Sequence, residues 1–245
     1  MGIKYNVNEA FFEKWSPDMA YTLGYIYADG NLNDSPYTRG KYISIASIDK
    51  ISILRIKNLL NSEHTIKETR SHFTGSKICY VLRIGSYKIY NDLLKLGLYP
   101  KKSLVIDFPK VPKKYLNHFT RGYFDGDGCI YFQKGKGKYG QPIIKRIRTI
   151  FTSGSRIFLF NLNIVLKDFG FSKGKIYSTK RAFQLKYPND DSIRMFKFMY
   201  SNAGINSFFM RKFSVFKDYF ELRPVHINKT IRKILSYHDN GHVVK

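Results

Sequence analysis

The sequence is poor in acidic residues for its length. It has only 18 Asp and Glu against 42 Lys and Arg, so its formal net charge is +24 at pH 7. An excess of this size repels itself within an isolated protein, and it indicates a polyanionic partner such as nucleic acid. A generically basic protein without such a partner is the alternative.

Cysteine and long apolar segments are also scarce. The two cysteines, Cys79 and Cys129, are too few for a disulfide framework or a cysteine-based metal site, so we expect them to be reduced. No apolar run is long enough to span a bilayer, and no signal peptide is recognisable, so we expect a soluble intracellular protein. The apolar content of 43% is typical of a folded globular chain.

One nine-residue pattern occurs twice. Residues 22–30 are TLGYIYADG and residues 120–128 are TRGYFDGDG, and each is predicted to be a helix that ends on an acid, Asp29 or Asp127.

The residues around the pattern predict where each helix begins and ends. Ser16 is a good N-cap, Pro17 suits the first helical position, and Gly30 predicts a left-handed C-cap. Pro112 and Gly128 bracket the second helix in the same way.

Small residues occupy one face of each predicted helix. Gly24 and Ala28 are four residues apart in the first, and Gly122 and Gly126 in the second. A strip without large side chains lets two helix backbones approach closely. We therefore predict that the two helices pack on each other through this strip.

That packing would bring Asp29 and Asp127 together. A carboxylate in the last turn of a helix is disfavoured by several tenths of a kcal/mol, because the helix dipole is negative there. Two such ends would repel each other unless cations lay between them. The arrangement therefore predicts bound divalent metal, and carboxylate oxygens suit Mg²⁺.

The paired nonapeptides resemble the two signature helices of the single-chain LAGLIDADG homing endonucleases. Both copies have Gly at position three, Asp at position eight and Gly at position nine. Tyr27 replaces the first Asp of the family pattern, and Thr22 and Thr120 replace its leading Leu. One nonapeptide alone would be a weak signal, but two copies in so basic a chain form a strong one.

The periodicity of apolar residues indicates the same order of elements after each motif, namely helix, two strands, helix, two strands and helix. With the resemblance, this predicts an α+β fold. Its two pseudo-symmetric αββαββα halves would pack through the motif helices and form a saddle of antiparallel sheets. We expect the first half to cover residues 1–108, the second 109–220, and a basic extension 221–245.

The resemblance implies a metal-dependent endonuclease that makes a double-strand break across the minor groove and leaves short 3′ overhangs. The implied metal is Mg²⁺, with Mn²⁺ or Ca²⁺ able to occupy the same sites. The implied catalytic residues are Asp29, Asp127, Lys102 and Lys212, with main-chain carbonyls of Gly30 and Gly128 as further metal ligands and Ser47 and Ser153 in a water network. The alternative for each lysine is an ordinary surface residue.

Two-stranded ribbons fit the major groove of DNA, where each base pair presents a distinct pattern of donors and acceptors. The strand faces directed away from the core are predicted to contact bases or phosphates through Tyr42, Ser44, Lys77, Arg83, Arg146, Arg148, Gln184 and Lys186. The loop tips are predicted to bind phosphate through Arg39, Lys41, Lys134, Lys136 and Lys138. Solvated charges without a ligand are the alternative.

The predicted partner is double-stranded DNA with a long asymmetric target site, and we expect a monomer. An RNA maturase on the same scaffold and a non-cleaving DNA-binding regulator are the competing functions. The chain lacks the terminal residues of an intein, so we expect a free-standing or intron-encoded protein. Its extension beyond residue 220 is predicted to be either a DNA backbone clamp or a packed C-terminal helix.

Overall fold

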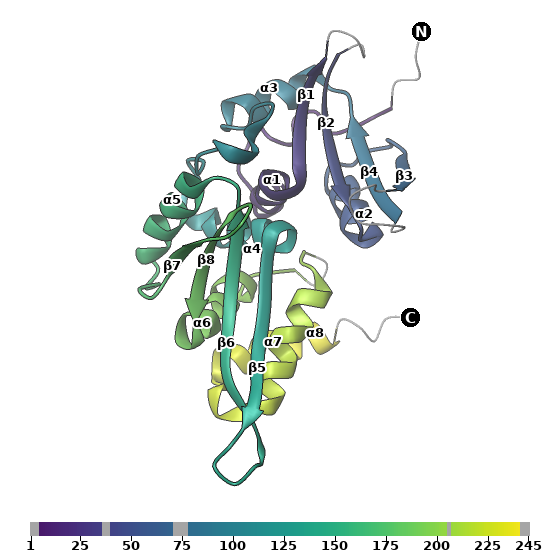
Figure 1. The fold of residues 1–245 in the computed structure, drawn as a ribbon. Coiled ribbons are helices and arrows are strands. Elements are labelled where there is room, and N and C mark those ends of the chain that lie inside the picture. Colours follow the sequence, from purple (N-terminus) through teal and green to yellow (C-terminus); the bar gives the residue numbers. More distant parts are fainter. Residues whose placement is uncertain (1–4, 36–39, 71–77, 205–206, 241–245) are drawn as a thin grey trace. The chain divides into compact units, whose positions relative to one another are not determined.

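The computed structural model describes residues 5–35, 40–70, 78–204 and 207–240 (Figure 1). The chain forms two compact units, Met1–Gly126 and Asp127–Lys245, and each contains one four-stranded sheet. The division falls near the end of the second motif helix, so nearly all of both motif helices belongs to the first unit. The boundaries expected at residues 108 and 220 remain predictions.

The first unit consists of one sheet and the helices that pack on it. Its elements are α1 (Pro17–Asp29), β1 (Gly30–Ser35), β2 (Gly40–Ser47), α2 (Lys50–Leu59), β3 (Ile66–Arg70), β4 (Ile78–Ile84), α3 (Tyr87–Lys95), η1 (Lys102–Leu104), η2 (Lys113–Tyr115) and α4 (Leu116–Asp127). The antiparallel strands lie in the order β1-β2-β4-β3, and α1, α2 and α3 contact the sheet.

The second unit repeats this plan and extends it. Its elements are β5 (Gly128–Lys136), β6 (Pro142–Ser153), α5 (Arg156–Lys167), β7 (Lys175–Ser178), β8 (Phe183–Pro188), α6 (Asn189–Tyr200), α7 (Met210–Leu222), η3 (Pro224–His226) and α8 (Lys229–Asn240). The strand order is β5-β6-β8-β7, and α5, α6 and α7 contact the sheet. The α+β class and the αββαββα order predicted from the sequence are confirmed.

Strand alternation separates a buried face of each sheet from an open one. In the first sheet, Ile45 of β2 lies opposite Leu82 of β4, and both are fully buried beneath the helices. In the second sheet, Phe151 and Leu185 form the equivalent buried pair. Of the apolar residues that alternate along β4, Leu82 and Ile84 are buried, whereas Ile78 at the start of the strand is 47% exposed.

The start of α1 agrees with the sequence, but its end does not. Ser16 accepts a hydrogen bond from the Met19 amide (3.0 Å), which confirms the predicted N-cap. Gly30 is extended (φ −87°, ψ 149°), so the predicted left-handed cap is wrong. The chain passes directly from α1 into β1, and glycine is required there because a Cβ would lie 2.6 Å from Cγ2 of Ile26. Gly128 likewise starts β5 without a positive φ.

The two motif helices pack backbone to backbone within the first unit. A Cβ added at Gly24 would overlap the main-chain oxygen of Phe119, and one added at Gly122 would overlap that of Tyr21. At the next turn, a Cβ at Gly126 would overlap that of Ala28. The strip of small residues therefore lies at the contact between α1 and α4.

The C-terminal extension contains a packed helix. Ile231 and Ile234 of α8 are buried, and α8 contacts α6. The basic residues Lys229, Arg232 and Lys233 lie on its exposed side. None of the helices in the described parts of the chain is long and apolar enough to cross a membrane.

The contact between α1 and α4 predicts how one added methyl group changes the stability of the protein. Gly122→Ala should lower the free energy of unfolding by about 1–3 kcal/mol, because the added Cβ meets backbone that cannot rotate away. Gly85→Ala is the matched control, since a Cβ at Gly85 has no neighbour within 4 Å and should change stability by no more than about 0.5 kcal/mol. Denaturant unfolding of both variants measures the difference, and equal stabilities would contradict this description of the contact.

Candidate functional site

The acid of the first motif lies beside the backbone of the second. Asp29 is the last residue of α1 and is half-buried. A Cβ added at Gly126 of α4 would lie 3.3 Å from Oδ2 of Asp29. Asp127 is the next residue of α4, also half-buried, and it ends that helix. The close contact between the helices therefore holds the Asp29 carboxylate next to the last turn of α4.

Lys102 binds the end of α1. Its ammonium nitrogen donates a hydrogen bond to the main-chain oxygen of Tyr27 (2.7 Å), two residues before Asp29. The side chain is only 5% exposed. A cation that binds a C-terminal carbonyl stabilises a helix end that carries an acid.

Lys212 has the corresponding place in the second unit. It lies in the first turn of α7 and is 7% exposed. It lines a cavity of about 130 Å³ together with Gly128, which directly follows Asp127. Both predicted lysines are thus buried next to a motif rather than exposed at the surface, and their catalytic role remains a prediction.

The two serines predicted for the water network occupy equivalent turns. Ser47 ends β2 and accepts a hydrogen bond from the Asp49 amide (3.1 Å), and Ser153 ends β6 and accepts one from the Ser155 amide (3.1 Å). Ser47 also influences Tyr25 of α1. Burial and the charge of Asp29 raise the pKa of the Tyr25 hydroxyl, and the Ser47 hydroxyl offsets part of that rise.

The donor set limits which metal could bind. Within the described part of the chain, no group of three or more His, Cys, Asp or Glu side chains is arranged to hold an ion. Mg²⁺ keeps several waters and is bound through one or two carboxylates together with substrate phosphates. Asp29 and Asp127, with the carbonyls of Gly30 and Gly128, match that chemistry, and their role as ligands remains a prediction.

A buried polar network lies further back along the same helix contact. Asp125 of α4 accepts a hydrogen bond from the Tyr21 hydroxyl (2.7 Å), so this third acid near the motif has a structural partner. Arg121 lies over the Tyr21 ring (5.3 Å) and donates to Nδ1 of His118 (3.0 Å). Burial, together with the Arg121 charge, lowers the pKa of His118 to about 4.

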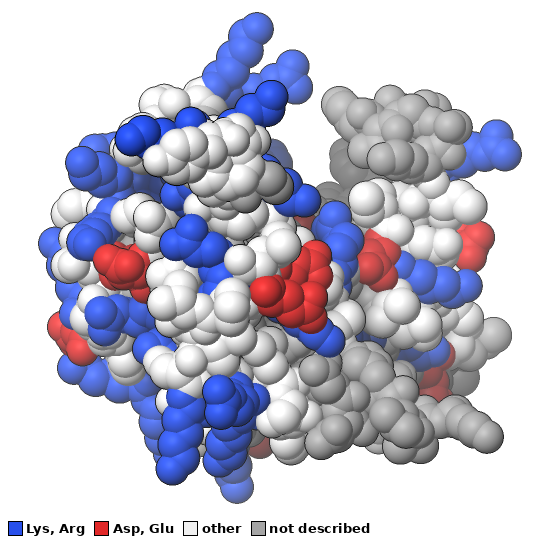
Figure 2. Space-filling model, turned by 90° about the horizontal axis from the view of Figure 1, so that it is seen from below, with Lys and Arg blue, Asp and Glu red and all other residues white. Residues whose placement is uncertain are grey.

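Most predicted DNA contacts lie on the open faces of the sheets. Along each strand these residues alternate with buried ones, so they point to the open side of the sheet. They are Tyr42, Ser44, Arg83, Arg146, Arg148, Gln184 and Lys186. Lys136 ends β5, and Lys138 lies in the turn that follows it. Figure 2 shows one face of the molecule, on which Lys and Arg side chains greatly outnumber acidic ones.

Two predicted phosphate contacts do not lie on an open face. Lys41 lies over the Tyr90 ring of α3 (5.3 Å) on the helix-covered side of its sheet. Lys134 lies over the ring of Phe132 (5.9 Å), which itself packs against Tyr219 of α7. Arg39 and Lys77 fall outside the described residues. The role of all four in DNA binding remains a prediction.

Several further residues, which the sequence pattern did not single out, belong to these faces. Lys67 of β3, and Lys175 and Tyr177 of β7, pair with open-face residues of the neighbouring strand. The face on which these three residues lie follows from how the edge strand pairs with its neighbour. The alternation of residues along a single short strand does not reveal that pairing. Tyr25 could have been found from its position four residues before Asp29, which places both on one helix face.

Two antiparallel four-stranded sheets, each accompanied by helices in this order, define the fold of the single-chain LAGLIDADG homing endonucleases. The resemblance predicted from the paired motifs is thus confirmed at the level of the fold.

Three solved structures illustrate the similarity. They are the homing endonuclease I-WcaI bound to its DNA recognition sequence (TM-score 0.54, 14% identity, 84% of this chain and 91% of that one), the I-LtrWI LAGLIDADG homing endonuclease bound to target DNA (0.56, 12%, 95% and 98%) and I-DmoI in complex with DNA and Ca (0.51, 17%, 80% and 92%). No protein-family model and no curated protein sequence matches the chain. At these identities the similarity establishes the fold alone.

The environment of His118 predicts acid sensitivity. Its pKa is about 4 in the folded protein and about 6.5 when exposed, so the unfolded chain binds the proton more readily. Its contribution to stability is therefore complete above pH 6.5 and is lost as the pH falls towards 4, by on the order of 1–3 kcal/mol.

Unfolding free energies at pH 7 and pH 4 for the wild type and His118→Gln measure this contribution. The variant retains an acceptor for Arg121 but cannot titrate, so it should lose less stability than the wild type over this range. Carboxylates that titrate in the same range are common to both proteins. Equal losses would show that His118 is not held neutral.

Proposed function

We propose that this chain is a site-specific DNA endonuclease that hydrolyses one phosphodiester bond in each strand of double-stranded DNA. The observation that carries the proposal is the duplicated helix end, in which an acid is followed by a strand-forming glycine and accompanied by a buried lysine. These are Asp29 with Lys102 in the first unit and Asp127 with Lys212 in the second. Cleavage that leaves short 3′ overhangs would follow the resemblance.

The predicted substrate is duplex DNA with a long asymmetric target site, bound by a monomer. Two sheets with cationic open faces suit a duplex, because a two-stranded ribbon fits the major groove. The net charge of +24 favours any polyanion and adds a strong, salt-dependent attraction to phosphate. Homing of a host intron would be the biological use of such an activity.

Asp29 and Asp127 are the proposed ligands of divalent metal, with the main-chain carbonyls of Gly30 and Gly128 as further donors. Bound Mg²⁺ supplies an activated water and neutralises charge on the attacked and leaving oxygens of the phosphate. Mn²⁺ or Ca²⁺ could occupy the same positions, and the structure of I-DmoI contains Ca together with DNA.

The lysines and serines would act on water and on developing charge. The buried ammonium groups of Lys102 and Lys212 are positioned next to the motif ends, where a fixed positive charge stabilises an oxyanion without reorganisation. Ser47 and Ser153, at equivalent strand ends, would hold waters through their remaining hydrogen-bonding capacity.

Two other functions are possible on the same scaffold, namely an RNA maturase that assists intron splicing and a DNA-binding regulator that does not cleave. Retention of both acids and both lysines favours cleavage. A protein that only binds gains nothing from carboxylates placed next to phosphate, because they repel it.

The first test of this proposal replaces the two motif acids. The wild type, incubated in Mg²⁺ with a library of randomised duplexes, should yield one long consensus among cleaved molecules. Asp29→Asn and Asp127→Asn should each reduce double-strand cleavage by at least about 100-fold, the scale for loss of one group that stabilises transition-state charge. Gel separation of intact, nicked and linear DNA measures the outcome.

Asp18→Asn is the matched control, because Asp18 is an exposed acid in the first turn of the same helix. It should cleave as the wild type does. If the wild type enriches bound duplexes but cuts none, the endonuclease proposal fails. Stimulated splicing of a host intron RNA would then favour the maturase.

The buried lysines predict a separation of binding from cleavage. Lys102→Met and Lys212→Met should each slow single-turnover cleavage by about 10²–10³-fold, because each removes a fixed charge near the reacting phosphate. Affinity for the selected site, measured in Ca²⁺, should change little. Lys101→Met serves as the control, since Lys101 is an exposed neighbour. Equal losses of affinity and rate would indicate a role in DNA binding instead.

A further inference from the structure

Arg83 and Lys186 occupy the same position in the two sheets. In the first unit, strand pairing runs from the motif residue Gly30 through Ile45 to Leu82, and Arg83 is the next residue of β4. In the second unit, the corresponding row ends one residue before Lys186 and consists of Gly128, Phe151 and Leu185. Counted from the two motifs, the two cations are equivalent.

Both side chains project from the open face of their sheet. Leu82 and Leu185 are fully buried under the helices, so the next residue of each strand points to the opposite side. Arg83 is exposed and Lys186 is half-buried. Each cation can therefore reach a ligand that lies along the sheet.

A tyrosine ring supports each of these cations. The guanidinium carbon of Arg83 lies 4.6 Å from the centre of the Tyr42 ring, and the ammonium of Lys186 lies 5.0 Å from that of Tyr177. A cation over an aromatic ring is held by the charge distribution of the ring. Less conformational entropy is then lost when the side chain binds a ligand.

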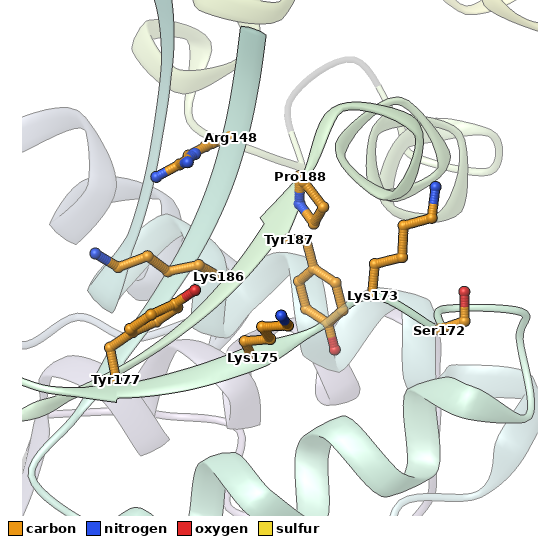
Figure 3. A pocket seen from close by; sticks show the side chains of 8 residues that line it. All are labelled: Arg148, Ser172, Lys173, Lys175, Tyr177, Lys186, Tyr187 and Pro188. Carbon is orange, nitrogen blue, oxygen red and sulfur yellow. The ribbon is translucent and has the colours of Figure 1, made fainter.

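In the second unit, Lys186 lines a cavity of about 430 Å³. Figure 3 shows Lys186 beside the Tyr177 ring, with Arg148 on the same side. Lys175 and Lys173 also line the cavity, which makes its wall strongly cationic. A site of this kind suits a ligand that offers several acceptor atoms.

We propose that Arg83 and Lys186 are matched guanine-recognition residues, one in each half of the target site. This inference rests on the proposed function. Guanine is the base that presents two acceptors, O6 and N7, in the major groove, and Arg and Lys are its preferred partners there. Because the two positions are equivalent by register, the target should contain one recognised G·C pair in each half, one read by Arg83 and the other by Lys186.

The second half-site should show the stronger guanine preference. Tyr42 lies on β2, three residues before Ile45, which pairs with Gly30. Arg148 lies on β6, three residues before Phe151, which pairs with Gly128. The second unit therefore adds a cation next to Lys186 where the first unit has an aromatic ring next to Arg83. The two halves of the target should differ for this reason.

Selection by binding tests the inference without requiring cleavage. Randomised duplexes are enriched on the wild type, Arg83→Gln and Lys186→Gln in Ca²⁺, and the bound sequences are compared. The wild-type consensus should contain the two matched guanines. Each variant should lose guanine preference at one of them, by about 5- to 150-fold, and keep the rest of the consensus.

Lys50→Gln is the matched control, because Lys50 also lies over a tyrosine ring, that of Tyr80 (5.4 Å), but on the helix-covered side of the sheet. It should leave every base preference unchanged. A consensus without the matched guanines would overturn the inference, and so would uniform weakening by Arg83→Gln and Lys186→Gln, which would identify phosphate contacts. If the wild type selects no consensus at all, the proposed function itself fails.

The supporting rings give a second readout. Tyr42→Phe and Tyr177→Phe keep the aromatic face and should retain the guanine preference. Tyr42→Ala and Tyr177→Ala should broaden it at the position assigned to the neighbouring cation, and Tyr42→Ala also removes the base or phosphate contact predicted for Tyr42 itself. If the alanine variants keep the wild-type preference, the rings do not position the cations.

Discussion

The contact between α1 and α4 is the constraint on which the site depends. Two helix backbones can approach this closely only where side chains are missing, and Gly24 and Gly122 each face a main-chain oxygen of the other helix. Because the contact is made by backbone, it leaves little freedom for the helices to slide or rotate. The residues at the helix ends, Asp29 among them, are therefore positioned by this backbone contact.

Close packing of this kind creates electrostatic problems that the surrounding residues solve. An acid at a helix C-terminus is disfavoured by the helix dipole, and Lys102 offsets this by binding a carbonyl of the same turn. Asp125, buried within the contact, is satisfied in part by the Tyr21 hydroxyl. Such groups are costly when buried alone, and the bonds of Lys102 to Tyr27 and of Tyr21 to Asp125 offset part of that cost.

The sequence predicted the class of fold and the order of elements because apolar periodicity and the repeated motif are local signals. The left-handed cap at Gly30 was predicted wrongly, because glycine is needed there for a close approach to Ile26 and the backbone is extended. Lys41 was expected at a loop tip, but β2 begins at Gly40, so alternation with Tyr42 and Ser44 places Lys41 on the helix-covered face. The burial of Lys102 likewise depends on a turn distant in sequence from the motif it contacts.

Duplication has different consequences for the motif ends and for the sheets. The phosphodiester group is the same in both strands of a duplex, so the acid, the glycine and the buried lysine can be the same in both halves. In a DNA target of the kind proposed, base sequence differs between the half-sites, so nothing requires the open faces to match, and Tyr42 and Arg148 do not. Arg83 and Lys186 are alike in one respect and different in another. They occupy equivalent strand positions in the two halves, but their side chains differ in geometry. A duplicated scaffold can thus keep one chemistry and still recognise an asymmetric sequence.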